Sequence, residues 1–112
     1  MIPVRSAHGS EGIPLKGGST LPFRVRRTWS APAGLYFERF YLVDPGTREV
    51  LFEGPLREER IWGLQSLTEL VDEVREPIEL AAGTYEMVFS LGGTLGGTVT
   101  VEAFDVSDEQ AA

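Results

Sequence analysis

Apolar and polar residues alternate with a period of two along most of the chain between residues 21 and 106. In FRVRRTW, residues 23–29, the first, third and seventh positions are apolar and share one face, and Arg27 interrupts this row. The segments TYEMVFSL (84–91) and TVTVEAF (98–104) show the alternation without interruption. Such alternation is typical of β-strands that bury one face and expose the other.

Two segments are predicted to form β-hairpins. LYFERFYLV (35–43) is apolar on both faces, which favours a strand covered on both sides, and the sequence DPGT after it is typical of a tight turn. The return strand REVLFE completes a hairpin over residues 35–53. A second hairpin is expected over 84–104, with LGGTLGG at its tip. This glycine-rich stretch lacks the Lys-Ser/Thr pair and following helix of a phosphate loop, so we interpret it as a turn.

The segment between the two hairpins changes its pattern. LREER is predicted to be a charged loop, and RIWGLQ a short strand. In SLTELVDEV, Ser66 and Glu69 match a capping box, and the apolar residues follow helical spacing. This indicates a short helix near residues 66–75. An irregular strand is the alternative, because so short a helix depends on packing for its stability.

These elements predict a single antiparallel β-sandwich, jelly-roll or immunoglobulin-like, over residues 21–106, with at most one short helix near 66–75. The run from residue 78 to 104 is similar in style to the last hairpin of many small modules of those two kinds, and this likeness carries no functional residue across. Residues 107–112 are interpreted as a polar C-terminal tail.

Residues 1–20 differ from the rest in containing no aromatic side chain, but four glycines and two prolines. We interpret them as an extended N-terminal arm that lies on a neighbouring subunit, with a frayed terminus as the alternative. Arg24 and Arg26 belong to the main basic cluster, together with Arg27, and we expect these arginines to pair with acidic groups of this chain or of a neighbour. The residues predicted to contact a partner are Ile2, Val4, Ile13, Leu15, Arg24, Arg26, Tyr36 and Phe40.

Composition narrows the functional classes. The chain has 112 residues, a formal net charge of −7 and no cysteine. The charge argues against nucleic acids and anionic membranes as partners, and the missing thiols exclude cysteine chemistry. The first residues lack the apolar core of a signal peptide, so we expect synthesis in the cytoplasm without one. Nine of the ten basic residues are arginine, and we interpret this bias as the mark of a GC-rich genome with a thermophilic habit.

Candidate catalytic groups are few. His8 is the single histidine and lies in the predicted arm, where nothing would hold it against a nucleophile. Glu69, Asp72, Glu73 and Glu76 would share one helix surface, and we interpret them as a solvated face. The C-terminal carboxylates lack the spacing of a calcium-binding EF-hand loop. We therefore predict no catalytic, cofactor-binding or metal-ligating residue, and no cofactor.

The function predicted from the sequence is that of a non-enzymatic structural subunit in a larger protein assembly, such as a capsid-decorating or other virion protein. Its partners would be protein subunits, in a homo-oligomer or a lattice. One alternative is a small carbohydrate- or lipid-binding module, in which Trp29 or Trp62 would stack on a ligand instead of packing in the core or at its rim. A second alternative is a small hydrolase that uses the carboxylates of residues 66–76.

Overall fold

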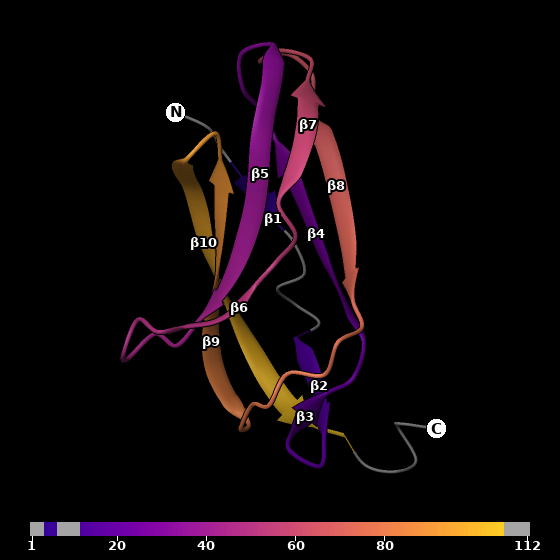
Figure 1. Ribbon diagram of the computed structural model, residues 1–112, viewed down its shortest axis with the longest axis vertical. Coiled ribbons are helices and arrows are strands. Elements are labelled where there is room, and N and C mark those ends of the chain that lie inside the picture. Colours follow the sequence, from indigo (N-terminus) through magenta and orange to yellow (C-terminus); the bar gives the residue numbers. More distant parts are fainter. Residues whose placement is uncertain (1–3, 7–11, 107–112) are drawn as a thin grey trace.

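The computed structural model describes residues 4–6 and 12–106, and over these residues it contains strands and no helix (Figure 1). The strands are β1 Val4–Ser6, β2 Ile13–Lys16, β3 Ser19–Thr20, β4 Phe23–Trp29, β5 Gly34–Val43, β6 Val50–Glu53, β7 Arg57–Ile61, β8 Thr68–Val74, β9 Gly83–Leu91 and β10 Thr94–Asp105.

The strands form two sheets. The larger has the order β3-β2-β10-β9-β5-β6, and β7 pairs with the first half of β5 beside β6. The smaller has the order β1-β4-β8. The predicted β-rich fold is confirmed, but the expectation of purely antiparallel pairing is wrong, because β2 runs parallel to β10. The larger sheet is therefore mixed.

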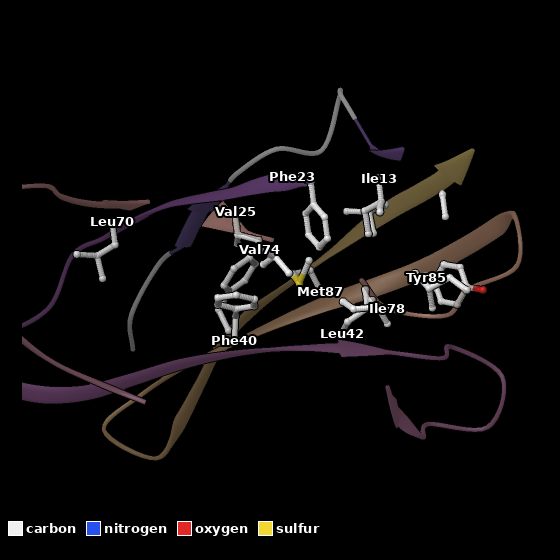
Figure 2. Close-up of a cluster of buried hydrophobic side chains, with 14 of the residues drawn as sticks. Ile13, Phe23, Val25, Phe40, Leu42, Leu70, Val74, Ile78, Tyr85 and Met87 are labelled. Atoms are coloured by element: carbon white, nitrogen blue, oxygen red, sulfur yellow. The ribbon is translucent and has the colours of Figure 1, made fainter. Parts of the chain in front are cut away.

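The core lies between the two sheets, and both contribute to it (Figure 2). Phe23 and Val25 of β4 and Val74 of β8 pack toward Phe40 of β5 and Met87 of β9. These side chains occupy alternate positions of their strands, as the period of two predicts. The regular interior row is what holds the small sheet on the large one.

Residues 68–74 form strand β8, so the helix predicted near 66–75 is wrong and the alternative of a strand is right. β8 pairs with β4 over its whole length, from Phe23 opposite Val74 to Trp29 opposite Thr68. Its inward residues are Leu70, Asp72 and Val74. A carboxylate at one of these three positions hid the alternation in the sequence.

Residues 13–20, which were predicted to belong to the arm, are part of the body of the fold. Ile13 and Leu15 are 2% and 0% exposed and belong to this chain's own core. Residue 20 anchors the same region, since the Thr20 N–H donates to the Ile78 carbonyl at 2.9 Å and its hydroxyl accepts the Ile78 N–H at 2.9 Å. The prediction of an arm is therefore wrong for residues 13–20, where pairing with the distant strand β10 decides the structure. Ile2 and His8 lie outside the described residues.

Both predicted hairpins are confirmed. β5 and β6 pair antiparallel, and the Asp44 carboxylate caps their turn by accepting the N–H groups of Gly46 and Thr47. The positive φ of this turn falls on Arg48 (65°) and not on Gly46. β9 and β10 join through Gly92 and Gly93, with φ of 62° and 82°, which matches a two-residue hairpin loop.

The charged segment after β6 is also a strand, because β7 covers Arg57–Ile61 where a loop was predicted. β6 and β7 are separated at Gly54, whose N–H donates to the Phe40 carbonyl at 2.8 Å. A Cβ at this glycine would come within 2.5 Å of the Phe40 ring. The close approach of backbone to ring therefore fixes the place where this edge of the sheet changes from β6 to β7.

Candidate functional site

The largest buried polar group is the guanidinium of Arg27, at the third inward position of β4. Arg27 and Glu38 of β5 both have fully buried side chains. Arg27 Nε donates to Glu38 Oε2 at 2.7 Å, and Nη2 donates to Oε1 at 2.6 Å. This two-pronged pair crosses from the small sheet to the large one, in the geometry that suits arginine and carboxylate best.

Neighbouring groups use the remaining hydrogen-bonding capacity of this pair. Trp29 Nε1 donates to Glu38 Oε2 at 3.1 Å, and Arg27 Nη1 donates to the Val25 carbonyl at 3.1 Å. The Arg27 guanidinium carbon lies 5.2 Å from the centroid of the Phe40 ring. Such complete pairing is the condition under which buried charges are tolerated.

Asp72 of β8 extends the cluster toward the surface. Its Oδ2 lies 2.8 Å from Arg27 Nη2, and its Oδ1 accepts from Arg57 Nε of β7 at 2.9 Å. Arg57 is partly exposed and also donates from Nη1 to Glu59 Oε2 at 3.1 Å. We call Arg27, Glu38, Asp72 and Arg57 the ion network. It joins four strands of both sheets, and its two arginines balance its two acids.

The electrostatics of the ion network favour fixed charges. Burial alone would lower the pKa of Arg27, but the hydrogen bonds and charges of Glu38 and Asp72 hold it above its usual value. Burial would raise the pKa of Asp72, but Arg57 and Arg27 hold it below its usual value. A general acid or base needs a pKa near the working pH. These shifts move both groups away from it, so the network is suited to holding strands together.

The other carboxylates of residues 66–76 do not gather. Glu69 and Glu73 lie on the outer face of β8, where Glu69 is 3.6 Å from Arg26 and Glu73 is 2.8 Å from Arg75. The expectation that the arginine cluster pairs with acids of this chain holds for Arg26 and Arg27. Among residues 4–6 and 12–106, the structure brings together no group of three or more side chains that could ligate a metal.

The residues predicted to contact a partner differ in whether they are exposed or buried. Arg24 and Arg26 are exposed on β4, and Tyr36 is half-buried, with its hydroxyl donating to the Pro32 carbonyl at 2.7 Å. Phe40 is 0% exposed and packs in the core, so its assignment to a contact surface is wrong. The assignment of Ile13 and Leu15 to a contact surface is wrong for the same reason, because both are buried in the core of this chain. Val4 lies in β1, beside Trp29 in register.

Exposed apolar side chains gather instead at the loop between β7 and β8, which the sequence analysis missed. Trp62, Leu64 and Leu67 are 68%, 62% and 63% exposed. The guanidinium carbon of Arg60, the last outward residue of β7, lies 5.3 Å from the centroid of the Trp62 ring. Leu35, 57% exposed, stands opposite Arg60 on β5. We call residues 62–67 the apolar loop. Three large apolar residues in WGLQSL, with no alternation, were the signal for it.

A second apolar feature lies on the outer face of the large sheet. A shallow, open hollow of about 380 Å³ is lined by residues of the β5–β6 and β9–β10 hairpins: Tyr41, Val43, Arg48, Val50, Val88, Ser90, Gly93 and Leu95. We call it the outer hollow. Val43 and Val88 are almost completely buried, while Leu95 is 66% exposed. An ion pair between Arg48 and Glu86 lies at its edge.

Comparison with known protein families and with curated proteins finds no match for this chain. Solved structures do resemble it. They include the Pseudomonas fluorescens alkylpurine DNA glycosylase AlkC bound to DNA with an abasic site analogue, at 9% identity and a TM-score of 0.56, covering 92% of this chain and 30% of that one. The Listeria innocua β-glucosidase with glucose matches at 13% identity and a TM-score of 0.57, covering 92% of this chain and 16% of that one.

A mutant of the same glucosidase with laminaribiose matches at 12% identity and a TM-score of 0.58, over 93% of this chain and 16% of that one. At such identities the likeness concerns the fold alone. This chain spans less than a third of the length of each of these enzymes, so it resembles one domain-sized part of a larger protein. In the described part of this chain, no helix is long and apolar enough to cross a membrane.

Proposed function

We propose that this chain is a non-catalytic structural or interaction subunit of a larger protein assembly, of which a virion component is one example. The observation that carries the proposal is the exposure of large apolar side chains at the apolar loop. Monomeric proteins seldom leave such groups together in water, and contiguous exposed apolar surface marks sites of association. Tryptophan beside arginine is also the composition of energetically dominant contacts between proteins.

We further propose that the two sheets form an immunoglobulin-like sandwich and not a jelly roll. The strand orders β1-β4-β8 and β10-β9-β5-β6 correspond to the two sheets of that arrangement, with a split first strand. The similar solved structures support a domain of this kind within larger proteins. An experimental structure in which β4 and β8 left the large sheet uncovered would contradict it.

The same features disfavour the alternatives. A carboxylate-dependent hydrolase needs two acids facing a substrate, whereas Asp72 points inward and Glu69 and Glu73 are paired with arginines outside. A sugar platform combines an open aromatic face with polar groups, whereas Arg60 already lies against one face of Trp62 and the large exposed neighbours Leu64 and Leu67 are apolar. Trp29, the other candidate, is fully buried.

The test is association of the full chain. Light scattering over a wide concentration range should show a mass above that of the monomer, or the immobilised chain should retain a protein partner from its native source. A chain that stays monomeric at millimolar concentration and retains no protein from that source would refute the proposal. Turnover of a glycoside that Glu73→Gln abolishes would replace it with the hydrolase.

A further inference from the structure

The apolar loop and the outer hollow occupy different parts of the molecule. The apolar loop follows the end of β7 at the top of Figure 1, whereas the turn of the β5–β6 hairpin, beside the outer hollow, projects at the lower left. One feature protrudes and the other is recessed. Two different surfaces of one chain that fit each other produce a head-to-tail contact, which closes into a ring or continues as a filament.

The size of the outer hollow suits a side chain from a loop. Its volume of about 380 Å³ is at the lower end of the range for ligand pockets, and it is open rather than enclosed. Val43 and Val88 form an apolar floor, and Leu95 and Val50 are exposed beside it. An indole ring can lie on such a floor, whereas the outward side chains of a whole strand could not enter it.

One charge beside each feature complements the other, while Arg48 in the lining of the outer hollow is already paired with Glu86. Arg60 contacts Trp62 but forms no ion pair within the described part of the chain. Glu53, likewise unpaired there, is exposed on β6 directly opposite Tyr41, which lines the outer hollow. An indole entering the outer hollow would thus bring an unpaired arginine to the side where an unpaired glutamate lies. Opposite charges at the margin of an interface fix orientation and favour encounter.

We propose that the apolar loop of one copy docks in the outer hollow of a second copy, with Trp62 on Val43 and Val88 and with Arg60 beside Glu53. This inference rests on the proposed function and names the partner as a second copy of this chain. A contact built on one loop buries less area than a standard interface. We therefore expect reversible association at high concentration, with Trp62 as the dominant contact.

Complementation between two variants tests the proposal. Trp62→Ser removes the loop contact and Leu95→Asp spoils the outer hollow; both residues are more than 60% exposed, so both variants should fold. Val71→Ser, on the outer face of β8 and 42% exposed, is the matched control. In sedimentation velocity the wild type and the control should grow beyond dimers with concentration. Each test variant alone should associate at least about thirtyfold more weakly, as loss of a dominant contact requires.

An equimolar mixture of Trp62→Ser and Leu95→Asp should form a one-to-one dimer that does not grow, because only one intact loop and one intact hollow remain. Self-association of both variants at the wild-type level, or a mixture that stays monomeric, would overturn the inference. The proposed function would then still hold if the chain associates through another surface. A wild-type chain that is monomeric but retains a protein from its native source would likewise overturn this inference and leave the proposed function standing. Binding of phosphatidylcholine vesicles that Trp62→Ser abolishes, without self-association, would reassign the loop to lipid.

Discussion

Between its two sheets the chain buries Arg27, Glu38 and Asp72, whereas at the apolar loop it exposes Trp62, Leu64 and Leu67. Each set lies where its own chemistry is least favoured. The buried charges gain nothing from burial itself and depend wholly on one another. The exposed apolar groups would each gain about 1.5–3 kcal/mol if they were fully covered. The first set is complete within the chain, and we propose that a partner completes the second set.

The interior set also determines which strands pair. Arg27 stands opposite Leu70 on β8 and reaches both Glu38 of β5 and Asp72. A slip of one residue in β4 would turn Arg27 to the outer face and leave the two acids buried without a cation. We infer that the ion network selects one register and one stacking of the sheets, which a uniformly apolar row would select less strictly.

The largest effect is expected from Arg27→Met. The variant leaves Glu38 and Asp72 without their buried cation, and the loss of one partner from such a cluster costs about 3–5 kcal/mol of unfolding free energy. Urea unfolding at neutral pH measures it. Arg26→Met is the control, because Arg26 is its exposed neighbour and a surface ion pair contributes about 0–1 kcal/mol. Equal effects of the two variants would mean that the ion network is not closed to water.

The sequence predicted the strands and hairpins because local periodicity and turn residues determine them. It failed where a charged residue occupies an inward position. Arg27, Glu38 and Asp72 all occupy inward positions of their strands. Of these, only Arg27 was interpreted as an interruption of a row, Asp72 was assigned to a solvated helix face, and Glu38 was not singled out. One arginine and two acids at inward positions were a signal for the ion network. Whether they contact one another depends on the order of the strands in the sheets, which no local sequence pattern determines.

The N-terminal region and the apolar loop failed for other reasons. Residues 13–16 pair with the adjacent residues 19–20 and also with residues 103–105, close to the other end of the sequence. The apolar loop has the composition of a core segment, and apolar residues without alternation do not reveal on which side of a surface they lie. Exposure there was visible only after the fold had placed residues 62–67 between two strand ends.

A second interior prediction concerns packing. Gly54→Ala places a methyl group within 2.5 Å of the Phe40 ring, next to the ion network. Overpacking of this kind costs about 1–3 kcal/mol. Gly34→Ala is the control, since its added Cβ would lie 3.6 Å from the Tyr36 ring, an ordinary contact. The midpoint of thermal unfolding should be lower for Gly54→Ala than for the wild type, and almost unchanged for Gly34→Ala. A tolerated Gly54→Ala would show that β6 and β7 can move away from β5.

A third prediction uses acid. The pKa of Asp72 in the folded chain lies below its ordinary value of 3.8, held there by Arg57 and Arg27 against the cost of burial. Its contribution to stability is therefore complete above about pH 4 and is lost as the pH falls through the folded value. Urea midpoints should fall steeply on acidification below about pH 4, and Asp72→Asn should flatten that fall while lowering stability at neutral pH.

Asp44→Asn provides the surface counterpart. The pKa of Asp44 is lowered by the N–H groups of Thr47 and Gly46 in the exposed turn of the first hairpin. Its removal should change the loss of stability in acid less than the removal of Asp72, because Asp44 lies in a surface turn and is held by two backbone N–H groups and not by arginines. If the fall of the urea midpoint at low pH depended on Asp44 and not on Asp72, the stabilising charges would lie at the surface. The ion network would then not be the source of the stability that is lost in acid.

The smallest effect on stability is expected at the most exposed large side chain. The two tryptophans separate the two regions, because Trp29 is 0% exposed and bonded to Glu38 whereas Trp62 is 68% exposed and contacts Arg60. Trp62→Ser should change the unfolding free energy of the dilute chain by no more than about 0.5 kcal/mol, as is usual for surface positions. The dilution matters, since association would add its own stabilisation. Trp29→Phe, which deletes only the donor to Glu38 and part of a ring, should cost several times more. If Trp62→Ser were as costly as Trp29→Phe at a concentration where the chain is monomeric, the apolar loop would belong to the folding of this chain, and its exposure would no longer argue for a partner.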